Sequence, residues 1–157
     1  MESFVRAFLK AALVWLTVGV ALGAAMVFWP MQALALRAAH AHANLLGFVS
    51  MMIFGVGYHV LPRFAGNPLH SRRLAFVHLW LANVGLGLLL LGWTLRLSAF
   101  RPGELALRAG AIVAAAGLLL FVYNLWHTLD ARKVGVPVGL TGPRRPTGSI
   151  HDPNGHT

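Results

Sequence analysis

The sequence contains no cysteine among its 157 residues. This absence excludes disulfide bonds, thiolate metal sites and the covalent attachment of a c-type haem. Any metal ion or haem in this protein must therefore be held by histidine, by methionine or by oxygen ligands.

Charged residues are also scarce: they make up 11% of the chain, whereas 57% of the residues are hydrophobic. This apolar content is too high for an ordinary water-soluble domain, so lipid is expected to surround most of the chain. The four acidic residues, Glu2, Glu104, Asp130 and Asp152, lie outside the deep apolar stretches. Because the sequence has no paired-carboxylate motif, glycine-rich phosphate loop or nucleophile elbow, hydrolase and phosphotransfer activities have no support.

Four apolar stretches are long enough to cross the hydrocarbon core of a bilayer, which needs about 20 residues. They cover residues 8–30, 39–62, 74–97 and 105–129. The connections between them are short, so consecutive helices are expected to run antiparallel. The sequence predicts an all-α integral membrane protein, a four-helix antiparallel bundle of up-down topology over residues 1–133. Residues 134–157 are rich in Gly, Pro, Arg and Ser and are expected to form a flexible cytoplasmic tail.

The net charge of +9 comes from Lys and Arg at the predicted helix ends and in the tails. In a membrane protein such residues are orientation signals, so no nucleic-acid partner is expected. One side of the predicted bundle carries Arg6, Lys10, Arg63, Arg72, Arg73, Arg132, Lys133, Arg144 and Arg145, and the other carries Arg37, Arg96, Arg101 and Arg108. This bias predicts that both termini are cytoplasmic and that the protein lies in the inner (cytoplasmic) cell membrane.

The second predicted helix carries two histidines near its outer end. On a helical wheel of about 100° per residue, two faces can be separated. The face of His40 contains Asn44, Gly47, Met51, Gly55, Tyr58 and Pro62, and is expected to be protein-facing. The face of His42 contains Leu46, Val49, Ile53 and Val60, and is expected to face lipid. The glycines beside His40 leave room for a flat group or for a close helix, so His40 is either a haem ligand or a hydrogen-bonded core histidine.

Three stretches of the sequence carry a resemblance to a known family. They are HAHANLLGFVSMMIFGVGYHVLPRF, then GNPLHSRRLAFVHLWLANVGL, and later GLLLFVYNLWHTLD. Together they span roughly residues 37 to 130, and they resemble subunit I of the haem-copper oxidases, particularly the cbb-type and nitric oxide reductase branch. The matching features are a His near the outer end of helix two, a glycine-containing helix leading to a Tyr and a Pro, an aromatic third helix, and the Asn of a Tyr-Asn pair.

The resemblance implies a haem b site in which His40 or His42 matches the family's helix-two ligand of the low-spin haem. It also makes Arg37, Arg96, Arg101 and Arg108 available to the haem propionates. The alternative is that these arginines are helix-end anchors. In the family, the second axial ligand and the ligands of the catalytic haem and of copper come from later helices. A four-helix relative is therefore not expected to be a complete oxidase, and a sixth ligand would come from His42, from a second copy of the chain or from a partner subunit.

Three further histidines, His59, His78 and His127, lie at similar depth near the inner ends of helices two, three and four. If they converge, they would suit copper, zinc or a second haem; otherwise they are scattered around the bundle. His70 is expected to lie at the membrane interface, and His151 and His156 to be solvated in the tail.

The sequence thus favours a membrane haem b-binding protein that acts in respiratory electron transfer or binds nitric oxide or oxygen. One alternative is a non-catalytic subunit or assembly factor of a respiratory or denitrification complex. Another is a copper- or zinc-binding membrane protein. Besides the lipid bilayer, the expected partners are a second copy of the chain, which would supply another His40, or a larger respiratory complex.

Overall fold

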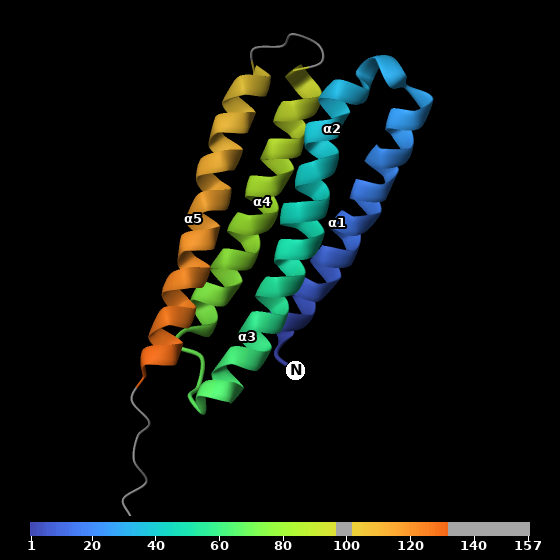
Figure 1. Cartoon of the computed structure of the whole chain (residues 1–157). Coiled ribbons are helices and arrows are strands. Elements are labelled where there is room, and N and C mark those ends of the chain that lie inside the picture. Colours follow the sequence, from blue (N-terminus) through green and yellow to red (C-terminus); the bar gives the residue numbers. More distant parts are fainter. Residues whose placement is uncertain (97–101, 132–157) are drawn as a thin grey trace, which may run out of the picture.

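The computed structural model describes residues 1–96 and 102–131, except for the side chain of Ala35. Its elements are α1 (Ser3–Phe28), η1 (Pro30–Gln32), α2 (Ala33–His42), η2 (Ala43–Ser50), α3 (Met51–Ala65), α4 (Arg72–Arg96) and α5 (Pro102–Asp130). The helices run up and down along one axis, and the N-terminus lies at the same end as the connection from α3 to α4 and the end of α5 (Figure 1).

Four helical segments are long and apolar enough to cross a membrane: Ser3–Phe28, Leu36–Ala65, Arg72–Arg96 and Pro102–Asp130. The predicted all-α membrane bundle is therefore confirmed. The helices begin earlier than their apolar stretches, because polar residues at a membrane surface continue a helix without entering the lipid. Leu97, Arg101 and the predicted tail at 134–157 lie outside the described residues.

The second membrane span is a single rod built from α2, η2 and α3 (Figure 1). Its middle part, Ala43–Ser50, is π-helical, so hydrogen bonds there reach five residues back instead of four. The Ser50 hydroxyl also donates to the Leu45 carbonyl, at 2.9 Å. The rod ends where Gly66 adopts a left-handed conformation with φ 69°, and the amides of Gly66 and Asn67 donate to the carbonyls of Arg63 and Pro62.

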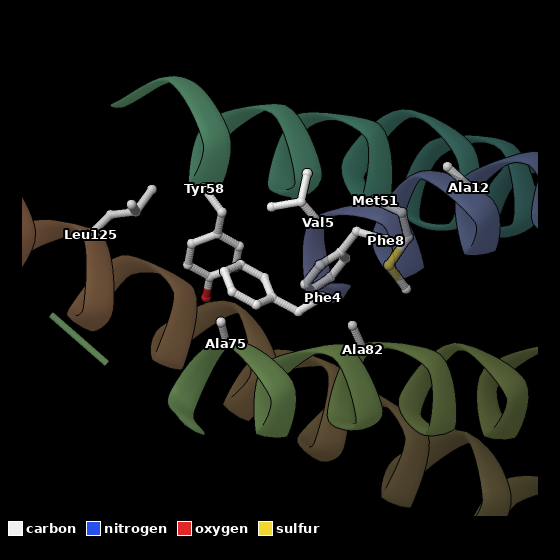
Figure 2. Packing of buried hydrophobic residues seen from close by; sticks show 9 residues of the cluster. All are labelled: Phe4, Val5, Phe8, Ala12, Met51, Tyr58, Ala75, Ala82 and Leu125. Atoms are coloured by element: carbon white, nitrogen blue, oxygen red, sulfur yellow. The ribbon is translucent and has the colours of Figure 1, made fainter. Parts of the chain in front are cut away.

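The end of the bundle that carries the N-terminus is named the inner end, and the opposite end the outer end, after the orientation that the charge bias predicts. The inner half of the bundle holds an apolar core to which α1, α3, α4 and α5 all contribute (Figure 2). Its buried members are Phe4, Val5, Phe8, Ala12, Met51, Tyr58, Ala75, Ala82 and Leu125. Since lipid is as apolar as these side chains, van der Waals contact rather than escape from water holds such a core together. Toward the outer side, Trp15 of α1 donates its indole N–H to Asn83 of α4, at 2.9 Å.

Helices α4 and α5 pack through glycines spaced seven residues apart. Gly85 and Gly92 of α4 face Gly103, Gly110 and Gly117 of α5. A Cβ on Gly85 would lie 2.6 Å from the Ala114 backbone nitrogen, and one on Gly110 would lie 2.7 Å from that of Leu89. Only glycine permits this approach, so the small-residue faces of these two helices are used inside the chain.

Candidate functional site

A cavity of about 350 Å³ lies between the second membrane span, α4 and α5. This volume is within the usual range for ligand pockets. Its lining comprises His42, Leu46, Ser50, Met51, Phe54, His78, Ala82, Leu86, Leu89, Ala111, Ala114, Ala115 and Leu118. Alanines form most of the α5 wall, and their small side chains create the space. His42 and His78 are the two imidazoles that line it.

These two imidazoles lie far apart along the bundle. His78 is hydrogen-bonded to Tyr58, which lies 16 residues after His42 on the same rod. At a rise of about 1.5 Å per residue, the Cα atoms of His42 and Tyr58 are about 24 Å apart along the helix axis. The cavity is therefore elongated, and one metal ion cannot bind both imidazoles.

His42 lies at the outer end of the cavity. Its Nδ1 is 2.7 Å from the Ala38 carbonyl oxygen, one turn back on the same helix. A carbonyl only accepts hydrogen bonds, so Nδ1 must carry the proton, and the lone pair of the neutral ring is on Nε2. This is the tautomer in which a histidine ligates a metal through Nε2.

His40 points toward α1 instead of the cavity. Its Nδ1 donates to the Gly19 carbonyl at 2.8 Å, and a Cβ on Gly23 would lie 3.0 Å from its ring. The Asn44 amide donates to the His40 carbonyl at 2.9 Å and lies 3.4 Å from the ring Nε2. The glycines of this face would admit either a flat group or a close helix. In the structure the space beside His40 is filled by a close helix, α1.

Two glycines of the His40 face also contact α1. A Cβ on Gly47 would lie 2.5 Å from the Trp15 Cβ, and one on Gly55 would lie 3.1 Å from the Phe8 Cβ. On the opposite face, Val49 and Ile53 are exposed, as the sequence predicts for a lipid-facing surface. Leu46 is exposed as well, and both Leu46 and the half-buried His42 also line the cavity. Gly47, Met51, Gly55, Tyr58 and Pro62 are all buried, so the predicted protein-facing side is continuous across the π-helical segment.

Trp93 of α4 lies beside His42. Its ring centroid lies 6.2 Å from that of His42, and the Arg96 guanidinium lies 5.5 Å above it. Its buried Nε1 has no hydrogen-bond partner in the described part of the chain. From sequence, a tryptophan beside a pocket cannot be told from one at the membrane interface.

Three of the four arginines that the resemblance makes available to propionates lie at this outer end. Arg37 is exposed on α2. Arg96 and Arg108 lie 3.8 Å and 3.6 Å from the carboxylate of Glu104. Arg101 lies outside the described residues.

His78 lies at the inner end of the cavity and is fully buried. Its Nδ1 is 3.1 Å from the Tyr58 hydroxyl, and Phe8, Phe54 and Phe121 surround the ring, with centroids 5.0, 4.6 and 5.5 Å away. The Tyr58 hydroxyl points toward α4 (Figure 2). Among the described residues, no partner hydrogen-bonds to the His78 Nε2.

The three histidines of the predicted inner site do not come together. The Nδ1 of His59 accepts a hydrogen bond from Arg63 at 2.9 Å, whereas His78 is enclosed by the aromatic core. His127 is exposed and lies beside His70, with ring centroids 5.1 Å apart. Residues 1–96 and 102–131 contain no group of three or more potential metal ligands.

No protein-family model matches the sequence. The chain is 30% identical over 119 residues to the protein described as cbb3-type cytochrome c oxidase subunit CcoN1 of Stutzerimonas stutzeri, covering 60% of this chain and 25% of that protein. It is 27% identical over 115 residues to cytochrome c oxidase subunit 1 of Rhodobacter capsulatus, covering 57% of this chain and 22% of that protein. The chain thus spans about a quarter of the length of these curated relatives. Over the matched part of its length, it is a relative of subunit I of the haem-copper oxidases.

Proposed function

We propose that this chain is a membrane haem b protein that binds its haem in the cavity between the second span, α4 and α5, with His42 as an axial ligand. The observation that carries the proposal is the position and tautomer of His42. It lines the cavity, and its hydrogen bond to Ala38 leaves the lone pair on Nε2. His40, which has the same tautomer but packs against α1, is the alternative ligand.

The residues at the outer end of the cavity fit a group that carries carboxylates. The buried indole N–H of Trp93 lacks a partner among the described residues and would donate to an anionic oxygen. Arg96 adjoins Trp93, and Arg37 and Arg108 are exposed at the same end. Guanidinium groups bind carboxylates through paired hydrogen bonds, so these residues would position the propionates.

When bound, haem would supply reversible electron transfer or an iron atom that takes a diatomic gas. The chain itself would hold the iron at His42, exclude water with leucine and alanine side chains, and anchor the acidic edge. His78 is too distant to bind the same iron atom as His42, so the cavity itself supplies one histidine ligand, and any second axial ligand would come from outside it. A single histidine ligand leaves a position open, and this favours the binding of nitric oxide or oxygen over electron transfer.

A non-catalytic subunit would dock against a larger complex through helix faces of small residues. Gly85 and Gly92 of α4 are instead buried against the glycine face of α5, and the glycines of α1 contact His40 and Asn44. A place in a larger respiratory complex therefore rests on the similarity to oxidase subunits alone. We also propose, from the charge bias, an inner-membrane location with the N-terminal end of the bundle facing the cytoplasm.

Filling the cavity tests this proposal. Ala115→Phe adds a ring to the α5 wall of the cavity. Leu119→Phe is the matched control, because Leu119 lies one turn away and is also exposed but does not line the cavity. Overpacking costs about 1–3 kcal/mol, so we expect Ala115→Phe to weaken haem binding roughly tenfold or more. Haem content per chain is measured by the pyridine haemochrome assay. Equal haem content in the two variants would contradict binding in this cavity.

A further inference from the structure

The connection between α3 and α4 is fixed to the last turns of α5. The side-chain amide of Asn67 donates to the carbonyls of Thr128 and Ala131, at 3.1 and 2.8 Å. The backbone amide of His70 donates to the Thr128 hydroxyl at 3.0 Å, and that hydroxyl donates to the Asn124 carbonyl at 2.7 Å. The backbone around His70 is therefore held against α5 by hydrogen bonds at several points.

Asn124 completes this attachment. Its side-chain oxygen accepts from the Ser71 amide at 2.9 Å, and its side-chain nitrogen donates to the Ser71 carbonyl at 2.8 Å. Asn124 is fully buried, and an unpaired buried amide is costly. These two hydrogen bonds therefore strongly favour one position of the α3–α4 connection. The Asn of the Tyr-Asn pair thus has a structural role at the inner end of the bundle.

This attachment brings together two histidines that are far apart in sequence. The imidazole centroids of His70 and His127 lie 5.1 Å apart, with their planes inclined at 32°. Tyr123 packs edge-on against His127, with centroids 4.4 Å apart, and limits the rotation of that ring. Both histidines are exposed, so an ion in the surrounding water could reach them.

We propose that His70 and His127 together bind one divalent transition-metal ion, for which Zn²⁺ and Cu²⁺ are the best-fitting candidates. Zn–N bonds are about 2.0–2.1 Å, so two imidazoles on a tetrahedral zinc ion have their centroids about 5 Å apart. The observed separation of 5.1 Å matches that arrangement. Neutral imidazole is a preferred ligand for both ions.

The pair supplies two ligands, so water completes the coordination of the ion. The described residues add no third histidine or carboxylate. Among the charged neighbours, Arg72 is paired with Glu2 at 2.8 Å, which offsets part of the local positive charge. Bound metal would join the α3–α4 connection to α5 by a further link. This site differs from the predicted combination of His59, His78 and His127 and is independent of haem binding.

The test uses the full chain without a histidine tag, in a background in which His151 and His156 are replaced by alanine, because those tail residues could bind metal themselves. Zn²⁺ is titrated into the detergent-purified protein by calorimetry, and Cu²⁺ is followed by electron paramagnetic resonance. We expect equimolar binding and a copper spectrum with nitrogen hyperfine structure. His70→Ala and His127→Ala should each weaken binding roughly tenfold or more, since each removes half of the protein ligands.

His59→Ala is the matched control, because it removes an inner-end histidine that is bonded to Arg63 and should leave metal binding unchanged. Unchanged helicity and elution volume of each variant show that the fold persists. Equal affinity in the background protein and in both single variants would overturn the proposal. So would a background protein that binds no Zn²⁺ or Cu²⁺ stoichiometrically.

Discussion

His42→Ala is expected to abolish haem binding, whereas His40→Ala is expected to retain it. His42 is the imidazole at the outer end of the cavity, and its Nε2 carries the lone pair that a metal needs. Loss of a group that hydrogen-bonds to a metal ligand costs about 10–100-fold in metal affinity, and loss of the ligand itself should cost more. The reduced haem b absorption band should therefore disappear in His42→Ala.

His40→Ala instead removes the hydrogen bond to Gly19 that connects the second span to α1. A typical hydrogen bond contributes about 0.5–1.5 kcal/mol, so this variant should unfold earlier in denaturant while it keeps its haem. His59→Ala controls for general effects of histidine replacement, because His59 lies outside the cavity lining. The opposite result, with haem lost in His40→Ala and kept in His42→Ala, would assign the ligand to His40 and place the haem between the second span and α1.

Gly85→Ala is expected to destabilise the bundle by about 1–3 kcal/mol, the usual cost of overpacking. The added Cβ would lie 2.6 Å from the backbone nitrogen and 2.8 Å from the Cα of Ala114. Backbone atoms cannot rotate away as a side chain would, so α4 and α5 must move apart. Ala114 also lines the cavity, and this separation should lower haem content as well.

Gly87→Ala provides the matched control on the same helix, because a Cβ there meets nothing within 4 Å. Alanine is the better helix former, so this variant should be as stable as the parent or slightly more stable. Both variants are compared by equilibrium unfolding in mixed detergent micelles. Equal stability of the two would contradict the close α4–α5 packing described above.

The fold was largely predictable from sequence, because a membrane span is specified by length and hydropathy alone. The four stretches, their order and their antiparallel connections all followed from this pattern. The helix ends did not, since residues such as Ser3 and Pro102 are polar or small and carry no hydropathy signal. Pro102 nevertheless occupies the first helical position, where its missing N–H costs nothing.

The candidate site was less predictable, because it depends on how the helices are rotated about their axes. A helical wheel separates the buried face of the second span from its exposed face, but it does not show that His42 lines a cavity formed with α4 and α5. The neighbours of His59, His78 and His127 are set by packing across helices, which hydropathy does not encode. His70 came beside His127 through Asn67, Asn124 and Thr128, whose hydrogen bonds join segments more than fifty residues apart.

The most direct test of the central proposal is a visible absorption spectrum of the purified full chain, oxidised and then reduced with dithionite, after expression with a supply of haem. The proposed function predicts the reduced absorption band of haem b, with haem equimolar to protein. A colourless protein that also fails to take up added haemin would contradict it.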